Sequence, residues 1–423
     1  MRLHAAIGDF IHRTGRIGVP LMLFVAWSAT FVTPAWGVVT PSVRDGVLTI
    51  TGDEDHDEIV VHCPDENVFV TAEMPGTGPA PCADLTSIVV TSGGGDDRID
   101  LRPVGLGKFA ALASVTIDAG DGNDDVFGSA APDAIDGGGA RDEIFADPAL
   151  QDVIEGGDGP DLLVTSFDSD VLITEDAFTT PLGTFTFATV EMVEVSGGRS
   201  PQVMDGRNFS GRLALLGAGG DDRILGGLGR NFLIGERGED RIVGGPGDDY
   251  LDGGYGRNAV IGKTGDDLLI STLGTNDRLD GGPGGDEFCC VFRSDGALFS
   301  GGPGTDAVRA IVDFGTAMVS DSFVKSQGHT ARIRSVEEAF VDAPEASSGV
   351  VIDASRFSGR THLEGGRFGG NDVLIGGSGP DELFGLDGDD ELDGGGGRDT
   401  LDGGPGADIC DGGPGRDGIT HCE

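Results

Sequence analysis

The chain has 423 residues, of which 28 are Lys or Arg and 72 are Asp or Glu, so its formal net charge is −44. This charge excludes the basic face with which a nucleic-acid-binding protein holds phosphates, and it favours cations as partners. Gly accounts for 76 residues and aromatic residues for only 6%, yet 38% of the residues are hydrophobic, which is enough for a core.

The first 37 residues have the pattern of an export signal. Three Arg residues precede an apolar run over residues 17–32, and Ala35-Trp36-Gly37 offers small residues at the two positions that a signal peptidase reads. The run is about 16 residues long, shorter than the roughly 20 that span a bilayer. We predict a signal peptide over residues 1–37, with an uncleaved anchor as the alternative. The mature chain is expected to be secreted, extracellular and without a membrane span.

Six Cys residues in an exported chain can form disulfides. Proximity in sequence favours a bond between Cys63 and Cys82, and another between Cys410 and Cys422 at the end of the chain. The adjacent Cys289-Cys290 pair is harder to assign, because side chains of successive strand residues point to opposite faces. The pairing of these two residues stays open.

Residues 38–91 are predicted to form a β-rich segment. The runs Val47–Ile50, Ile59–Val61 and Ile88–Val90 are short and apolar, which is typical of strands. The acidic run Asp53–Glu58 lies between two of them. We interpret this run as a solvated turn, with a further metal site as the alternative.

Three stretches of the chain, the first of which begins at residue 92, contain repeats with a period of nine. Many imperfect copies fall in phase with the perfect ones, and an apolar residue such as Ile224, Leu233 or Leu374 stands two positions after each sixth residue. The string Gly-Gly-x-Gly-x-Asp occurs without deviation starting at Gly156, Gly244, Gly281, Gly301, Gly376, Gly394, Gly403 and Gly412.

Each unit contains six turn-forming residues followed by three extended ones. A helix is excluded, because Gly at three of nine positions would cost roughly 1 kcal/mol each relative to Ala. Two nonapeptides make two strands and two turns, so successive 18-residue coils are expected to stack as parallel strands with the apolar residues inward. A flexible Gly- and Asp-rich linker is the alternative, and the constant phase argues against it.

The repeats resemble those of the repeats-in-toxin (RTX), or hemolysin-type, calcium-binding family, whose consensus is Gly-Gly-x-Gly-x-Asp-x-U-x with U a large apolar residue. The resemblance covers roughly half of the mature chain. It implies an all-β fold of parallel β-rolls, a β-helix solenoid, in which Asp carboxylates and backbone carbonyls of the turns hold several Ca²⁺ ions between coils. The metal ligands that it implies are Asp97, Asp124, Asp142, Asp161, Asp222, Asn231, Asp240, Asp249, Asn258, Asp267, Asp277, Asp286, Asp306, Asp372, Asp381, Asp390, Asp399, Asp408 and Asp417.

The resemblance also implies which side chains face each other. Calcium takes six to eight hard oxygen ligands, so carbonyl oxygens must supplement the carboxylates. The amide oxygens of Asn231 and Asn258 carry no charge, and the sites that contain them should be weaker. The expected pairs are Asp222 with Asp240, Asp249 with Asp267, Asp372 with Asp390, Asp381 with Asp399, Asp390 with Asp408, and Asp399 with Asp417.

The repeats divide into three arrays separated by two β-rich spacers. The second spacer duplicates the first, since Asp205–Arg212 recurs as Asp353–Arg360, each with the string Phe-Ser-Gly-Arg. We interpret this string as a packed Phe beside a turn, with ligand recognition as the alternative. The predicted segments are a degenerate array over residues 92–164, a spacer over 165–216, a central array over 217–309, a spacer over 310–364, and a C-terminal array over 365–423 with a Cys cap.

No enzyme motif is present in the sequence. His-Glu-x-x-His and Gly-x-Ser-x-Gly are both missing, and no stretch outside the repeats is long enough for an ordinary catalytic domain. We therefore predict no catalytic or cofactor-binding residue and a structural or adhesive calcium-binding protein, with cell-surface or matrix components as candidate partners. The alternative is a calcium-dependent secreted hydrolase, or a toxin-like effector, with an unrecognised active site.

Overall fold

The computed structural model describes residues 37–423, apart from residues 72–75, 106, 147–151, 272, 290–295, 313, 328, 345 and 347. Over these residues the chain is all-β, with one three-residue 3-10 turn, η1 (Cys82–Asp84), and no α-helix. None of the helical structure in this part of the chain is long and apolar enough to span a membrane. The predicted signal peptide lies outside the described residues, except for Gly37.

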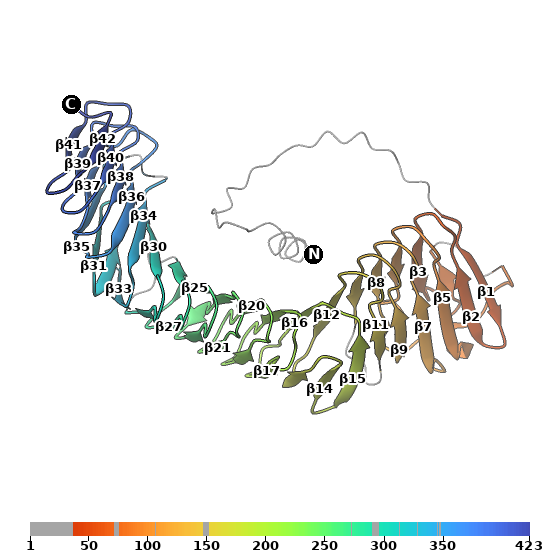
Figure 1. Ribbon diagram of the computed structural model, residues 1–423. Coiled ribbons are helices and arrows are strands. Elements are labelled where there is room, and N and C mark those ends of the chain that lie inside the picture. Colours follow the sequence, from red (N-terminus) through yellow and green to blue (C-terminus); the bar gives the residue numbers. More distant parts are fainter. Residues whose placement is uncertain are drawn as a thin grey trace. The chain divides into compact units, whose positions relative to one another are not determined.

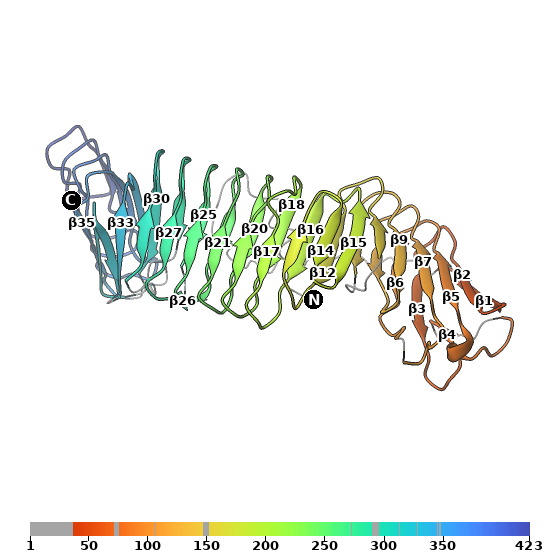
Figure 2. The same ribbon diagram turned by 90° about the horizontal axis from the view of Figure 1, so that it is seen from below.

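Nearly all strands belong to two sheets, here called ladder A and ladder B, in which most neighbouring strands are parallel (Figures 1 and 2). In order of pairing, ladder A contains β1 (Thr40–Arg44), β2 (Val47–Thr51), β5 (Ser87–Thr91), β7 (Ser114–Asp118), β9 (Asp133–Asp136), β11 (Val153–Glu155), β15 (Gly183–Ala188), β14 (Ala177–Thr180), β13 (Val171–Ile173), β17 (Val203–Asp205), β19 (Arg223–Leu225), β21 (Arg241–Val243), β24 (Ala259–Ile261), β27 (Arg278–Asp280), β29 (Leu298–Ser300), β33 (His329–Arg334), β32 (Phe323–Ser326), β31 (Thr316–Ser320), β35 (Val351–Arg356), β37 (Val373–Ile375), β39 (Glu391–Asp393) and β41 (Ile409–Asp411).

Ladder B contains the strands that alternate with these along the chain. In order of pairing they are β4 (Phe69–Val70), β3 (Glu58–His62), β6 (Arg98–Asp100), β8 (Asp125–Phe127), β10 (Glu143–Phe145), β12 (Leu162–Ser166), β16 (Met192–Ser196), β18 (Arg212–Leu216), β20 (Asn231–Ile234), β22 (Tyr250–Asp252), β25 (Leu268–Ile270), β28 (Glu287–Cys289), β30 (Ala307–Ile311), β34 (Glu338–Asp342), β36 (Arg360–Glu364), β38 (Glu382–Phe384), β40 (Thr400–Asp402) and β42 (Gly418–Thr420). A separate parallel pair joins β23 (Tyr255–Gly256) to β26 (Leu273–Gly274).

The register of the ladders confirms the predicted 18-residue coil. In ladder A, Ile224 pairs with Ile242, which pairs with Val260, so the eighth residues of successive coils stack on one another. These side chains are fully buried between the two ladders. The single apolar residue of each nonapeptide therefore builds the core, because side chains of a three-residue strand alternate between the inner and outer faces.

The spacers are built into the same two ladders. Each adds a three-stranded antiparallel meander to ladder A, β13 to β15 in the first spacer and β31 to β33 in the second. Of their other strands, β17 and β35 continue ladder A in parallel, and β16, β18, β34 and β36 continue ladder B in parallel. Phe209 and Phe357 of the repeated Phe-Ser-Gly-Arg string are both buried, as expected for packed side chains beside turns. The segment boundaries stay a prediction, since arrays and spacers share both ladders.

Two disulfides lie among the described residues. Cys63 is bonded to Cys82, and Cys410 is bonded to Cys422, which are the two pairs that sequence proximity favours. Cys410 occupies an eighth position and pairs in register with Leu392, so its bond attaches the last residues to the final coil. Cys289 is also disulfide-bonded, whereas Cys290 lies outside the described residues.

Candidate metal centres

The turns of neighbouring coils lie in direct contact, and glycine makes this possible. In the turn that starts at Gly281, the φ values of Gly282 and Gly284 are +110° and +152°. Residues other than glycine rarely adopt such values. A Cβ atom on Gly284 would lie 1.8 Å from the carbonyl oxygen of Gly265 in the preceding coil. Glycine therefore allows the backbone of one turn to lie directly against a carbonyl oxygen of the turn in the preceding coil.

Sixth-position side chains are linked from coil to coil by hydrogen bonds. The backbone N–H of Asp222 donates to Oδ1 of Asp240, 18 residues later, over 2.8 Å. We call each line of side chains linked in this way a column, column A beside ladder A and column B beside ladder B. All the predicted pairs are neighbours in these columns: the N–H to Oδ1 distances are 2.9 Å for Asp249 and Asp267, 2.7 Å for Asp372 and Asp390, 2.9 Å for Asp381 and Asp399, 2.8 Å for Asp390 and Asp408, and 3.0 Å for Asp399 and Asp417.

The columns include residues that the motif does not identify. Column B of the first array runs through Asp57, Asp97, Asp124, Asp142, Asp161 and Glu191, and that of the central array through Asn231, Asp249, Asp267, Asp286, Asp306 and Glu337. Column A of the central array runs through Gln202, Asp222, Asp240, Asn258 and Asp277, and Asp133 with Asp152 continues the pattern in the first array.

Asp57, Glu191 and Glu337 were not predicted as site residues. Asp57 is fully buried at the head of a column, so the interpretation of Asp53–Glu58 as a solvated turn is wrong for this residue. Its neighbour in the column is 40 residues away, and the two Glu residues lie 30 and 31 residues from theirs. No nonapeptide period links Asp57, Glu191 and Glu337 to their neighbours in the columns. The only sequence signal for their place in a column was that each is an acidic residue directly before a strand.

Of the nineteen predicted ligands, all except the half-buried Asp417 are buried, and none of these is more than 3% exposed. Their carboxylates take no part in the salt bridges that the described residues form. One carboxylate oxygen, Oδ2, is buried without a hydrogen-bond partner in Asp97, Asp124, Asp142, Asp161, Asp222, Asp240, Asp267, Asp286, Asp306, Asp390, Asp399 and Asp408.

Burial without compensation raises the pKa of several of these carboxyl groups. Desolvation, together with the negative charges of the neighbouring Asp residues, raises the pKa of Asp124 and of Asp267 to about 8. The same causes raise the pKa of Asp142 and of Asp240 to about 7. The ionised columns are therefore unfavourable by themselves and need a positive partner, either protons or metal ions.

Asn231 provides part of this compensation internally, whereas the amide nitrogen of Asn258 donates only to the carbonyl oxygen of Gly254. Nδ2 of Asn231 donates to Oδ1 of Asp249 over 2.8 Å and to the carbonyl oxygen of Gly229 over 2.9 Å. Hydrogen bonds from Gly245 and Asn231 limit the pKa of Asp249, which burial raises only to about 6. The pair of Asn231 and Asp249 therefore contains an amide that donates to the carboxylate, whereas a pair of two Asp residues contains only carboxylates.

The chemistry of the turns fits calcium. In a regular turn, a Cβ on Gly385 would lie 2.5 Å from Oδ2 of Asp390 and 2.6 Å from the carbonyl oxygen of Gly403 in the next coil. A buried carboxylate oxygen and a backbone carbonyl from different coils thus converge beside a residue that has no side chain. Hard oxygen donors of both kinds are the ligands that Ca²⁺ prefers.

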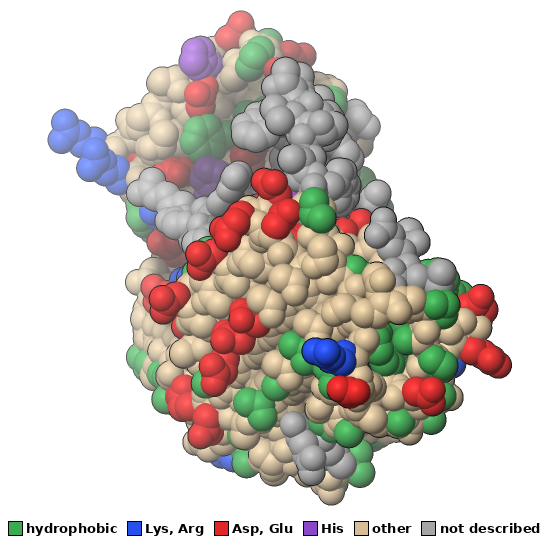
Figure 3. Space-filling model, turned by 90° about the vertical axis from the view of Figure 1, so that its right-hand side faces the viewer, with side chains coloured by type: hydrophobic (Ala, Val, Ile, Leu, Met, Phe, Trp, Pro, Cys, Tyr) green, Lys and Arg blue, Asp and Glu red, His purple; other side chains and the backbone are tan. Residues whose placement is uncertain are grey.

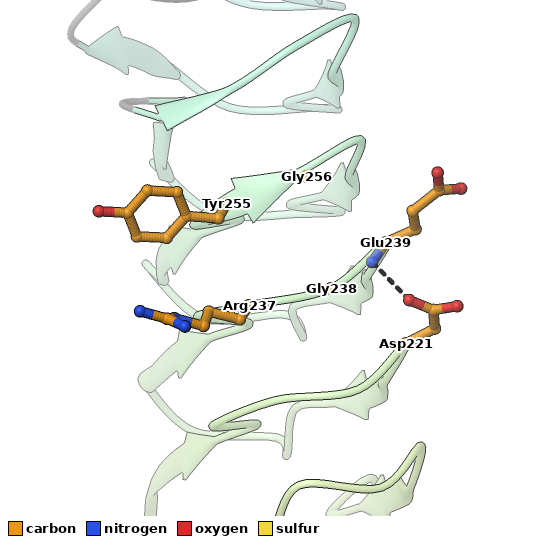
Figure 4. A pocket seen from close by; sticks show the side chains of 6 residues that line it. All are labelled: Asp221, Arg237, Gly238, Glu239, Tyr255 and Gly256. Carbon is orange, nitrogen blue, oxygen red and sulfur yellow. Dashed lines mark hydrogen bonds between the residues drawn. The ribbon is translucent and has the colours of Figure 1, made fainter.

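A hollow of about 490 Å³ is lined by turn residues of two coils, but Asp221 and Glu239 point to one side of it and Arg237 and Tyr255 to the other, so no polar groups converge (Figure 4). Glu239 donates its backbone N–H to Oδ1 of Asp221, and its carboxylate is paired with Arg257 at 2.7 Å. This arrangement does not resemble a catalytic site.

Asp342, His362 and Glu364 lie on the outer face of ladder B, with one possible ligand atom from each within 4.8 Å of the others. Each already has an ionic partner: Arg309 lies 3.3 Å from Asp342, Glu382 lies 3.2 Å from Nδ1 of His362, and Arg367 lies 3.2 Å from Glu364. This group is accounted for as part of a surface ion-pair network.

Stacked parallel coils with columns of buried carboxylates define the class of a calcium-binding β-roll. A family model of the RTX calcium-binding nonapeptide repeat matches residues 117–148, 151–176, 216–251, 234–269, 368–401 and 385–419. The chain therefore carries RTX repeats in all three arrays and is a calcium-binding repeat protein. No catalytic family is found, and a search of curated proteins gave no match.

Proposed function

We propose that this chain is an extracellular structural or adhesive protein whose coils fold when Ca²⁺ neutralises the columns. The observation that carries the proposal is the set of buried carboxylate oxygens without hydrogen-bond partners. The unfolded chain has no such columns, so the free energy of calcium binding contributes directly to folding. A protein of this kind would remain unfolded at cytoplasmic calcium levels and fold after export, where sites of millimolar affinity can fill.

The described residues support this proposal in two further ways. Two disulfides are compatible with an oxidising compartment, where such bonds persist. Acidic side chains are numerous on the surface and Lys or Arg side chains are few, as Figure 3 shows for one face. Such a surface suits calcium-bridged contact with other acidic polymers, including cell-surface or matrix components.

Calcium titration of the chain from residue 38 onward tests the proposal. Far-UV circular dichroism should show little β signal in chelator at pH 7.5 and a cooperative gain as calcium is added. Magnesium should be a poor substitute, because it is smaller and dehydrates reluctantly. A full β signal in chelator would refute calcium-driven folding, and equal retention of the chain on native cells with and without calcium would refute an adhesive role.

A further inference from the structure

The two spacers begin with the same local structure, which lies outside the nonapeptide repeat. Column B of the first array ends at Glu191, and column B of the central array ends at Glu337. In both, the backbone N–H of the last Asp donates to Oε2 of the Glu over 3.0 Å: Asp161 to Glu191, and Asp306 to Glu337. Each Glu thus occupies the place of a sixth-position Asp in the next coil.

Each Glu faces a buried carboxylate that lacks a partner. Asp161 and Asp306 are both 0% exposed, and Oδ2 of each has no hydrogen-bond partner. The register places the residue before β12 next to the residue before β16, and the residue before β30 next to the one before β34. Two carboxylates are therefore adjacent at the start of each spacer, and like charges this close repel unless a cation lies between them.

The backbone completes the same oxygen arrangement that the regular turns have. A Cβ on Gly156 would lie 2.2 Å from the carbonyl oxygen of Thr189 and 2.7 Å from Oδ2 of Asp161. A Cβ on Gly301 would lie 2.0 Å from the carbonyl oxygen of Ser335 and 2.2 Å from Oδ2 of Asp306. Thr or Ser here replaces the glycine that supplies the carbonyl in a nonapeptide turn.

This replacement requires an unfavourable backbone conformation at both positions. Thr189 has φ +50° and Ser335 has φ +49°, in the left-handed region that costs a residue with a side chain about 1 kcal/mol or more. The same unfavourable φ occurs at the same point of both spacers. This recurrence indicates that the position of the carbonyl oxygen of Thr189 or Ser335 has a role. In both spacers the carbonyl oxygen lies beside the same glycine as the buried carboxylate oxygen.

We propose that Asp161 with Glu191, and Asp306 with Glu337, each form one further Ca²⁺ site, completed by the carbonyl oxygen of Thr189 or Ser335. The inference rests on the proposed binding of calcium by the columns. These two sites lie outside the nonapeptide motif and join each enlarged spacer coil to the array before it. Because the side chains of Glu191 and Glu337 are exposed whereas the column Asp residues are buried, these sites should fill after the regular ones.

The test is the number of calcium ions bound by the chain from residue 38 onward, measured by equilibrium dialysis at saturating free calcium. The double variant Glu191→Gln/Glu337→Gln keeps an acceptor for the Asp N–H groups but removes the charge, and it should bind two ions fewer. Hydrogen exchange of β16 and β34 should increase while the β signal in saturating calcium is retained. Glu338→Gln is the matched control, since Glu338 is the next residue and lies near Arg360 on the outer face.

A second double variant, Glu191→Ala/Glu337→Ala, tests whether the Gln amide oxygen still binds the metal. Loss of two ions in either double variant supports the two sites. An unchanged ion count in both would overturn this inference while leaving calcium-driven folding of the arrays intact. A wild-type chain that binds no calcium would instead overturn the proposed function itself.

Discussion

The central and C-terminal arrays are built from the same 18-residue coil, but their columns are neutralised differently. The central array has Asn231 and Asn258 in its columns, whereas every sixth position from Asp372 to Asp417 is Asp. The amide of Asn231 donates to the carboxylate beside it and to a turn carbonyl. The pairs between Asp372 and Asp417 contain no amide, and the only comparable side-chain donor among the described residues of these columns is the hydroxyl of Thr361, which donates to Oδ1 of Asp381. Oδ2 is buried without a partner in both arrays, in Asp390, Asp399 and Asp408 as in Asp222, Asp240, Asp267, Asp286 and Asp306.

If the columns bind calcium as proposed, this difference of one atom per pair should set how strongly the folding of a coil depends on calcium. An amide nitrogen compensates a carboxylate in the absence of metal but contributes no charge to a site. A second carboxylate makes the metal-free coil less stable and the metal-bound coil more stable. Calcium dependence and calcium affinity should therefore rise together from the central array to the C-terminal array.

Removal of calcium should have the largest effect. Hydrogen exchange measured on the chain from residue 38 onward resolves both arrays in one molecule. In chelator, we expect protection over residues 365–423 to fall by about 100-fold or more, since one site at 100 times its Kd contributes about 2.7 kcal/mol. Protection over residues 217–270 should fall less. Equal losses in the two arrays would contradict the comparison.

The pH dependence of the metal-free chain should have the next largest effect. Burial raises the folded-state pKa of Asp267 to about 8 and of Asp240 to about 7, above the value of 3.8 for an exposed Asp. The folded state therefore binds protons more tightly than the unfolded state. In chelator, the contribution of these protonated Asp residues to the free energy of unfolding should be fully present below about pH 4. It should be lost as the pH rises through 6 to 8.

Far-UV circular dichroism in chelator at pH 4.5 and pH 8 measures this effect, and the β signal should be larger at pH 4.5. Saturating calcium should reverse the trend, because the metal binds the ionised carboxylates. A β signal in chelator that rises with pH would show that the columns are not the dominant titrating groups.

Single substitutions should convert one kind of pair into the other. Asn231→Asp should lower the calcium midpoint of the central array about tenfold, or about 1.4 kcal/mol, and should weaken its protection in chelator. Asp399→Asn should raise the midpoint of the C-terminal array by a similar factor, because Asp399 belongs to two pairs. Asn371→Asp, an exposed fifth-position change, is the control. Unchanged midpoints in both column variants would indicate that packing, rather than charge, sets affinity.

Opening the last disulfide should have the most local effect. The double variant Cys410→Ser/Cys422→Ser removes a bond that spans 12 residues, and a loop of this size contributes at most about 3 kcal/mol. Hydrogen exchange should increase in β41 and β42 alone, with the calcium midpoint of the central array unchanged. Loss of protection throughout the C-terminal array would show that the bond supports more than the last coil.

The sequence by itself determined the coil. A nine-residue period with glycine in the turns and one apolar residue in each strand allows little other than stacked parallel strands, and the register of Ile224, Ile242 and Val260 agrees with it. The same period placed Asp222 against Asp240 and Asp381 against Asp399. These features were predictable because each depends on neighbours at a fixed, short separation.

Only the tertiary structure decided how the arrays continue into the spacers. Asp57, Glu191 and Glu337 join the columns across 30 to 40 residues, and antiparallel meanders enter ladder A between strands that would otherwise be adjacent. No period spans these separations. The residue that lies at the end of a column depends on two factors, the length of the meander and the register in which the next strand pairs. Both are set by packing against the preceding coil.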